Sequence, residues 1–182
     1  MAMFFTADTH FGHRGIIRMC ERPYADAAEM DEALIKSWNA RVQPSDTVWH
    51  LGDFAMGPKR ERLAAIFERL NGTKRLVKGN HDGPATLALP WAQVEKLVEI
   101  SDHGVSLVLC HYPLRAWRGS FGDTIQLFGH THGLLPGTTQ SCDVGVDSWG
   151  MAPVSLAQIL HRCGQEKAEP EERLRARGKS PR

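Results

Sequence analysis

Five short apolar runs divide this chain, and each of them ends at polar or glycine residues. They cover residues 3–7, 47–51, 75–78, 106–110 and 125–128. A short apolar run bounded by polar or turn residues is typical of a strand buried in a sheet. The pattern therefore predicts five strands whose carboxyl ends carry polar side chains.

Helical periodicity alternates with these strands. Asp26, with Glu29 three residues later, is typical of a helix start, and Met30, Leu34 and Trp38 then recur every four residues. The sequence therefore predicts a first helix that begins after Asp26.

A second helix is predicted after Pro58, a residue that suits a first helical turn. One face of this helix is apolar with the spacing of an amphipathic helix, and Asn71-Gly72 ends it. The residues of that face are Leu63, Ile66, Phe67 and Leu70.

The second half of the chain is richer in strands. A hairpin is expected where residues 98–101 and 106–110 flank the turn signal Asp102-His103-Gly104. A strand is expected at residues 143–146, and a short helix, capped by Ser155, at residues 156–161. From Gly164 the chain is charged and poor in apolar residues. We therefore predict one domain over residues 1–163 and a disordered tail over residues 164–182.

Strands that alternate with helices, followed by strands joined by a hairpin, predict an α/β fold with mixed sheets. Ligands of open α/β sheets collect outside the carboxyl ends of strands. The five polar segments follow such ends, so we expect them to meet in one site.

Composition restricts the possible partners. The chain has 182 residues, 42% hydrophobic and 24% charged residues and a net charge of +1, as expected for one globular domain with no strong sign of duplex nucleic acid binding. No apolar run approaches the roughly 18 residues that cross a bilayer, so no membrane partner is predicted. Asp8 leaves no room for a signal peptide ahead of the polar segments, so we expect a cytoplasmic protein. The oligomeric state stays open.

The polar segments supply seven candidate metal ligands. A mixed nitrogen and oxygen set without thiolate suits Mn, Fe, Zn or Ni, and Mg less well. Seven ligands need two metal ions with one bridging carboxylate. Such pairs lie ~3.5–4 Å apart, clamp the oxygens of an in-line displacement at phosphorus and make hydroxide available near neutral pH. The candidates are Asp8, Asp53 and Asn80, with oxygen, and His10, His111, His130 and His132, with imidazole nitrogen.

Five other residues are candidates for catalysis or substrate binding. His81 is placed to protonate a leaving oxygen or to bind a phosphoryl oxygen, with Asp82 orienting its ring. His13, Arg14 and Arg115 are candidate phosphate contacts. A structural role is the alternative for each of these three.

The five segments resemble the signature blocks of the calcineurin-like metallophosphoesterase superfamily. The blocks are D-x-H at Asp8, GD at Gly52, GNHD at Gly79, H at His111 and GHxH at Gly129. The resemblance implies a four-layer α/β/β/α sandwich with mixed sheets and a centre of two metal ions. It also implies that His81 is a general acid or a transition-state stabiliser.

The resemblance further implies a ligand set for each metal. One metal would be bound by Asp8, His10, Asp53 and His132. The second would be bound by Asp53, Asn80, His111 and His130, so that Asp53 is the bridge.

Within the superfamily the chain resembles small single-domain bacterial and phage phosphoesterases that open with D-x-H-F-G-H, here residues 8–13. The implied activity is hydrolysis of phosphodiesters in nucleotide-like substrates. A phosphomonoesterase and a nucleotide pyrophosphohydrolase are alternatives. The alternative from another class is a catalytically silent protein-binding scaffold, but the complete ligand set and His81 disfavour it.

Overall fold

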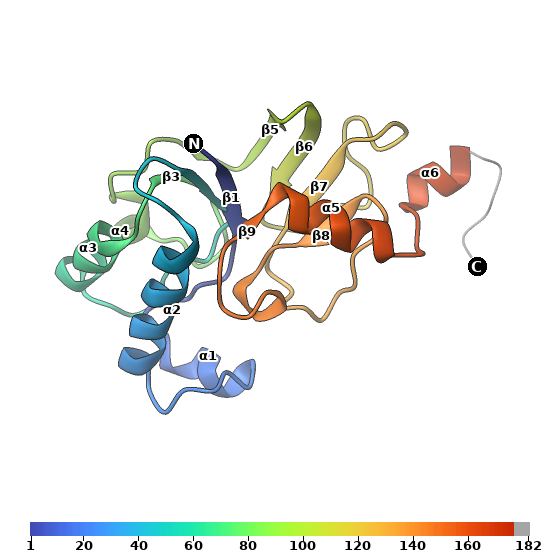
Figure 1. The fold of residues 1–182 in the computed structure, drawn as a ribbon. Helices are drawn as coiled ribbons and strands as arrows, with labels where there is room; N and C mark the ends of the chain where they lie inside the picture. The colour runs from blue at the N-terminus through green and yellow to red at the C-terminus, as the bar shows by residue number, and fades with distance from the viewer. Residues whose placement is uncertain (177–182) are drawn as a thin grey trace.

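Two mixed β-sheets form the framework of the computed structural model, which describes residues 1–176 (Figure 1). The first sheet has the order β4-β3-β2-β1-β9, with β1 to β4 parallel and β9 antiparallel. Its strands are β1 (Met3–Thr6), β2 (Thr47–His50), β3 (Thr73–Val77), β4 (Val94–Glu95) and β9 (Val154–Ser155).

The second sheet has the order β5-β6-β7-β8. β5 and β6 form the expected antiparallel hairpin across His103-Gly104, and β6, β7 and β8 are parallel. The strands are β5 (Leu97–Asp102), β6 (Val105–Cys110), β7 (Ile125–Phe128) and β8 (Ser141–Asp143). The predicted α/β fold with mixed sheets is therefore confirmed.

Strands β1 and β2 of the first sheet serve two cores, because successive side chains point to opposite faces. Val48 of β2 packs with the apolar faces of α2 (Ala27–Arg41) and α3 (Arg60–Arg69), which Figure 1 shows on one side of the molecule. The neighbouring Trp49 packs between the sheets, against a cluster that includes Leu107 and Leu127. The two cores hold the first sheet in place from both faces.

Helix starts follow the local signals in the sequence. The Asp26 carboxylate accepts the N–H groups of Ala28 and Glu29 at the start of α2. Ser155 and Gln158 form a capping box at the start of α5 (Leu156–Gln165), which lies against β8 and β9, one strand from each sheet. Two shorter helices, α1 (Arg14–Met19) and α4 (Pro84–Leu87), follow the first and third polar segments.

The strand expected at residues 143–146 is wrong in its position. β8 ends at Asp143, whose carboxylate accepts the Gly145 N–H at 2.7 Å and so turns the chain. A 3-10 helix, η1 (Val146–Ser148), follows. Val144 and Val146 favour a strand, but the hydrogen bond of the Asp143 side chain determines the local backbone conformation. The apolar pattern of the sequence gives no sign of this bond.

The segment predicted to be disordered contains a helix, α6 (Glu171–Ala176), at the end of the molecule beyond α5 (Figure 1). Polar contacts hold it: Glu171 accepts from Arg115 at 2.9 Å, and Glu172 accepts from Ser120. Hydropathy does not signal such contacts. Residues 177–182, the last six residues of the predicted tail, lie outside the described residues, and the domain limit at residue 163 stays a prediction.

Among the described residues, no helix has the length and apolar character needed to cross a bilayer.

Candidate metal centre

The seven predicted ligands meet where five strands end. Each of two groups of three has ligand atoms that all lie within 4.8 Å of one another. The first group comes from the loops after β1 and β7, and the second from the loops after β2, β6 and β7. The first group is Asp8, His10 and His132, and the second is Asp53, His111 and His130.

Asp53 lies between the two groups. Its Oδ2 is 3.7 Å from Nε2 of His10 and 3.5 Å from Nε2 of His111. Asn80 joins the second group, since its Oδ1 is 3.0 Å from the same nitrogen of His111. One carboxylate that faces both groups is the arrangement that a bridge between two ions requires.

Several buried polar atoms of the first group have no hydrogen-bond partner. They are Oδ1 of Asp8 and both ring nitrogens of His10. Burial raises the pKa of Asp8 to about 7 and lowers the pKa of His10 to about 3. Unpartnered buried polar groups are costly, and a divalent cation satisfies carboxylate and neutral imidazole together. The donor set therefore fits a metal ion.

The second group has partners within the protein. Burial acts to raise the pKa of Asp53, but the hydrogen bonds from His111 and from the His81 N–H outweigh it and lower that pKa to about 2. Burial acts in the opposite direction on His111, and the contact with Asp53 raises its pKa. Nδ1 of His111 lies 2.7 Å from the Leu51 carbonyl oxygen, which leaves Nε2 facing Asp53.

Five of the seven ligands have a left-handed backbone. The φ values are 57° for Asp8, 49° for His10, 58° for Asp53, 70° for His130 and 50° for His132. Asp and His enter this region more readily than most residues, yet each instance costs on the order of 1–3 kcal/mol. Such strain clusters at functional sites, where the surrounding structure holds it.

Two glycines allow the ligand loops to approach closely. A Cβ on Gly52, where φ is +93°, would lie 2.6 Å from Nδ1 of His111. A Cβ on Gly79 would lie 2.3 Å from Oδ1 of Asp53. Both distances are shorter than a Cβ atom can approach another heavy atom. A side chain at either position would therefore clash, which explains the glycine in the GD and GNHD segments.

The expectation that Asp82 orients the His81 ring is wrong. The buried carboxylate of Asp82 accepts three backbone N–H groups, from Asp53 at 2.9 Å, Phe54 at 2.9 Å and Gly79 at 2.8 Å. These bonds tie the loops after β2 and β3 together. Asp82 therefore positions the backbone of Asp53, a candidate metal ligand, because its three hydrogen bonds all hold backbone N–H groups of these two loops.

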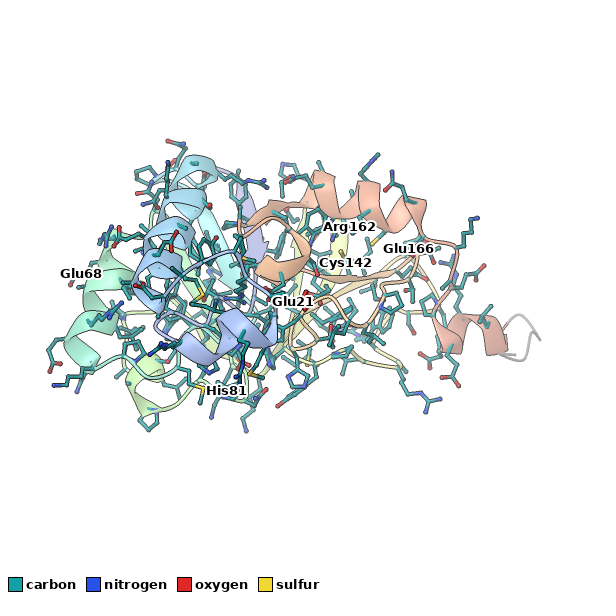
Figure 2. The ribbon with its side chains drawn as sticks, turned by 90° about the horizontal axis from the view of Figure 1, so that it is seen from below. Glu21, Glu68, His81, Cys142, Arg162 and Glu166 are labelled. Carbon is teal, nitrogen blue, oxygen red and sulfur yellow. The ribbon has the colours of Figure 1, made fainter. Side chains whose placement is uncertain are left out.

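His81 lies at the rim of the site. Figure 2 shows it at the edge of the molecule, away from Cys142 and Arg162. Its N–H donates to Oδ1 of Asp53 at 2.8 Å, and the centre of its exposed ring is 5.4 Å from that of His10. The backbone is thus fixed while the imidazole stays accessible to a substrate.

A buried ion pair supports the first group, and sequence reasoning missed its cation. Arg22, whose side chain is 0% exposed, donates two hydrogen bonds of 2.8 Å to Asp147. The same guanidinium donates to the backbone carbonyl of Asp8 at 2.7 Å. Asp147 lies 2.7 Å from Nδ1 of His132, which orients the other ring nitrogen toward the site. A single arginine after a short helix gives no periodic signal.

The three candidate phosphate contacts differ in position. His13 lies beside the site, with its ring centre 5.3 Å from that of His10. Arg14 is exposed on the first turn of α1. Arg115 is paired with Glu171 of α6, so its guanidinium is engaged there.

A two-sheet α/β fold that gathers carboxylate, amide and imidazole groups at its strand ends defines a metallophosphoesterase. A family model described as "Calcineurin-like phosphoesterase superfamily domain" matches residues 1–146. The chain therefore belongs to the calcineurin-like phosphoesterase superfamily and is a phosphoric ester hydrolase.

Two relatives and one solved structure are similar over most of their length. The uncharacterised protein MJ1445 of Methanocaldococcus jannaschii is 31% identical over 166 residues, which cover 87% of this chain and 89% of the relative. The gene 66 protein of Mycobacterium phage L5 is 29% identical over 81% of this chain and 87% of its own. AQ665 of Aquifex aeolicus, a protein of unknown function, shares the fold with a TM-score of 0.69 and 22% identity over 87% and 97% of the two chains.

Proposed function

We propose that this phosphoester hydrolase uses two divalent ions and cleaves phosphodiesters in nucleotide-like substrates. The observation that carries the proposal is the position of Asp53, whose Oδ2 faces a histidine of each ligand group. Asp8, His10, His132 and Asp53 would hold one ion, and Asp53, Asn80, His111 and His130 the other. We propose Mn, Fe, Zn or Ni for both sites.

Ions held by these residues would supply positive charge to the phosphoryl oxygens and would lower the pKa of a bound water. The chain supplies the proton for the leaving group. His81 carries an accessible imidazole next to His10, on a backbone that Asp53 fixes. A diester has an alkoxide leaving group that needs this proton, so His81 acts as the general acid. His13, whose ring centre is 5.3 Å from that of His10, contacts a phosphoryl oxygen.

The test compares two aryl substrates. The purified protein is stripped with a chelator and refilled with Mn, Ni, Zn or Mg, and hydrolysis of bis-p-nitrophenyl phosphate and p-nitrophenyl phosphate is measured. We expect turnover of the diester to exceed that of the monoester after refilling with Mn or Ni. Preference for the monoester would contradict the diester assignment and favour a phosphomonoesterase. Absence of turnover with every metal, despite two bound ions, would contradict the proposal and favour the scaffold alternative. Cytoplasmic location stays a prediction.

A further inference from the structure

A hollow lies next to the proposed second metal site. Its volume is about 390 Å³, and its lining consists of Lys78, Gly79, Asn80, Lys96 and Tyr112. Asn80 is at once a proposed metal ligand and a wall of the hollow. A substrate phosphate held at the metal centre would therefore have the rest of its molecule within reach of this lining. The volume falls in the range of small-molecule sites.

Tyr112 forms an aromatic wall with a fixed orientation. Its ring is steeply inclined to the ring of His111, with centres 5.0 Å apart at 73°, and to the ring of His130, at 4.8 Å and 66°. The side chain is nevertheless 45% exposed. A ring that is held by two neighbouring rings and is still partly open to solvent suits stacking of a planar base, which is tolerant of base identity.

Two lysines supply the charge of the hollow. Lys78 directly follows β3, and Lys96 lies at the crossing from β4 in one sheet to β5 in the other. Both side chains are exposed. Within residues 1–176 neither ammonium group takes part in an ion pair, whereas Arg22, Arg62 and Arg69 do. Two uncompensated cations beside a phosphate-handling centre favour a second anionic group on the substrate.

We infer that the hollow binds the portion of the substrate beyond the scissile phosphate, and that this portion is a nucleotide with a second phosphate group. The base stacks on Tyr112, and the second phosphate lies between Lys78 and Lys96. The inference rests on the proposed phosphodiester hydrolysis at the adjacent centre. A small nucleotide fits better than a long strand, because a strand needs a basic groove along its backbone and the chain has a net charge of only +1.

Equilibrium binding tests the charge of the hollow independently of turnover. Isothermal titration of the Mn-loaded protein with a nucleoside 5′-monophosphate and with a nucleoside 3′,5′-bisphosphate gives the two affinities. We expect the bisphosphate to bind roughly tenfold more tightly, because its second phosphate makes charge-assisted hydrogen bonds. The double variant Lys78→Gln/Lys96→Gln should remove that preference. The control Lys36→Gln/Lys167→Gln, which removes two exposed charges outside the hollow, should keep it.

Tyr112 is tested by the same titration. Tyr112→Leu should weaken binding of both nucleotides relative to inorganic phosphate by roughly tenfold, because stacking is lost, and Tyr112→Phe should restore it. Equal affinity of the wild type for the two nucleotides would overturn the inference, as would a bisphosphate preference that survives the lysine changes. Turnover is a separate readout: a bisphosphate preference without hydrolysis of any diester would refute the proposed function and leave the nucleotide subsite standing.

Discussion

The two ligand groups of the centre differ in burial and in support. In the first group, Asp8 and His10 are buried, and Asp147 and Arg22 hold His132 from behind. In the second group, Asp53 and His111 are equally buried, but His130 is exposed and borders Tyr112 at the hollow. We therefore expect the first group to retain an ion more firmly and the second to meet the substrate.

The pKa values of Asp8, in the first group, and Asp53, which lies between the groups, also differ. Burial raises the pKa of Asp8 to about 7, and one oxygen of Asp8 has no hydrogen-bond partner. The pKa of Asp53 is lowered to about 2, since His111 and the His81 N–H stabilise its charge against the effect of burial. We therefore expect the first group to depend more on a bound cation for its charge balance than the second group, which has partners within the protein.

The largest expected effect comes from removing the carboxylate that the two groups share. Asp53→Asn should lower kcat by roughly four orders of magnitude and reduce the metal content, because each ion loses a charged ligand. Turnover and metal analysis of the dialysed protein measure both. Asp123→Asn, which changes a fully exposed carboxylate, is the control. A variant that retains two ions and the full rate would contradict the bridge.

A smaller loss of activity is expected when His81, the proposed proton donor to the leaving group, is removed. His81→Ala should reduce kcat for a diester with an alkoxide leaving group by about 10²- to 10³-fold, because a positioned proton donor is lost, while the metal content stays near the wild-type value. His103→Ala changes an exposed histidine on the β5–β6 turn and should have no effect. Unchanged turnover in His81→Ala would refute the role of this residue as an acid.

Asp147 is not a proposed metal ligand, but its contact with His132 supports the first group, so changing it tests that support. Asp147→Asn should lower the affinity of the first site for its ion by about 10- to 100-fold, because the His132 ring loses its charged partner. Competition with a graded series of chelators measures the two affinities. We expect the second site to change less than the first. Equal weakening of both sites would show that the two groups are not supported separately.

The smallest expected effect is on the stability of the metal-free protein. The pKa of Asp8 is about 7 in the folded chain and 3.8 when unperturbed, so its ionisation opposes folding. This penalty is absent below pH 4, grows between pH 4 and 7 and is complete above pH 7. Asp8→Asn should therefore stabilise the metal-free protein by about 2 kcal/mol at pH 8 and by little at pH 4.5. Thermal unfolding at both pH values checks this, and a pH-independent difference would contradict it.

The meeting of the candidate ligand segments was predictable from the sequence, because these segments obey simple rules. Each ligand segment follows an apolar run, and parallel strands deliver such segments to one edge of a sheet. Helix α2 and helix α5 were also foreseeable, since Asp26 and Ser155 are local capping signals.

The remaining features depend on contacts between residues distant in sequence. Arg22 reaches Asp147 across 125 positions, and Asp82 ties Asp53 to Gly79 through backbone N–H groups. Neither has a periodicity or a spacing that a single sequence reveals. Helix α6 was missed for the same reason, because Arg115 and Ser120, far earlier in the chain, hold it.

The most direct test of two unequal sites that share Asp53 is a Mn²⁺ titration of the metal-free protein followed by electron paramagnetic resonance. The account predicts a six-line signal of an isolated ion during the first equivalent, when the first group fills. During the second equivalent this signal should give way to the multiline signal of an exchange-coupled pair, since bridged ions lie ~3.5–4 Å apart. Two equivalents that yield only six-line signals, or saturation at one equivalent, would contradict the shared centre.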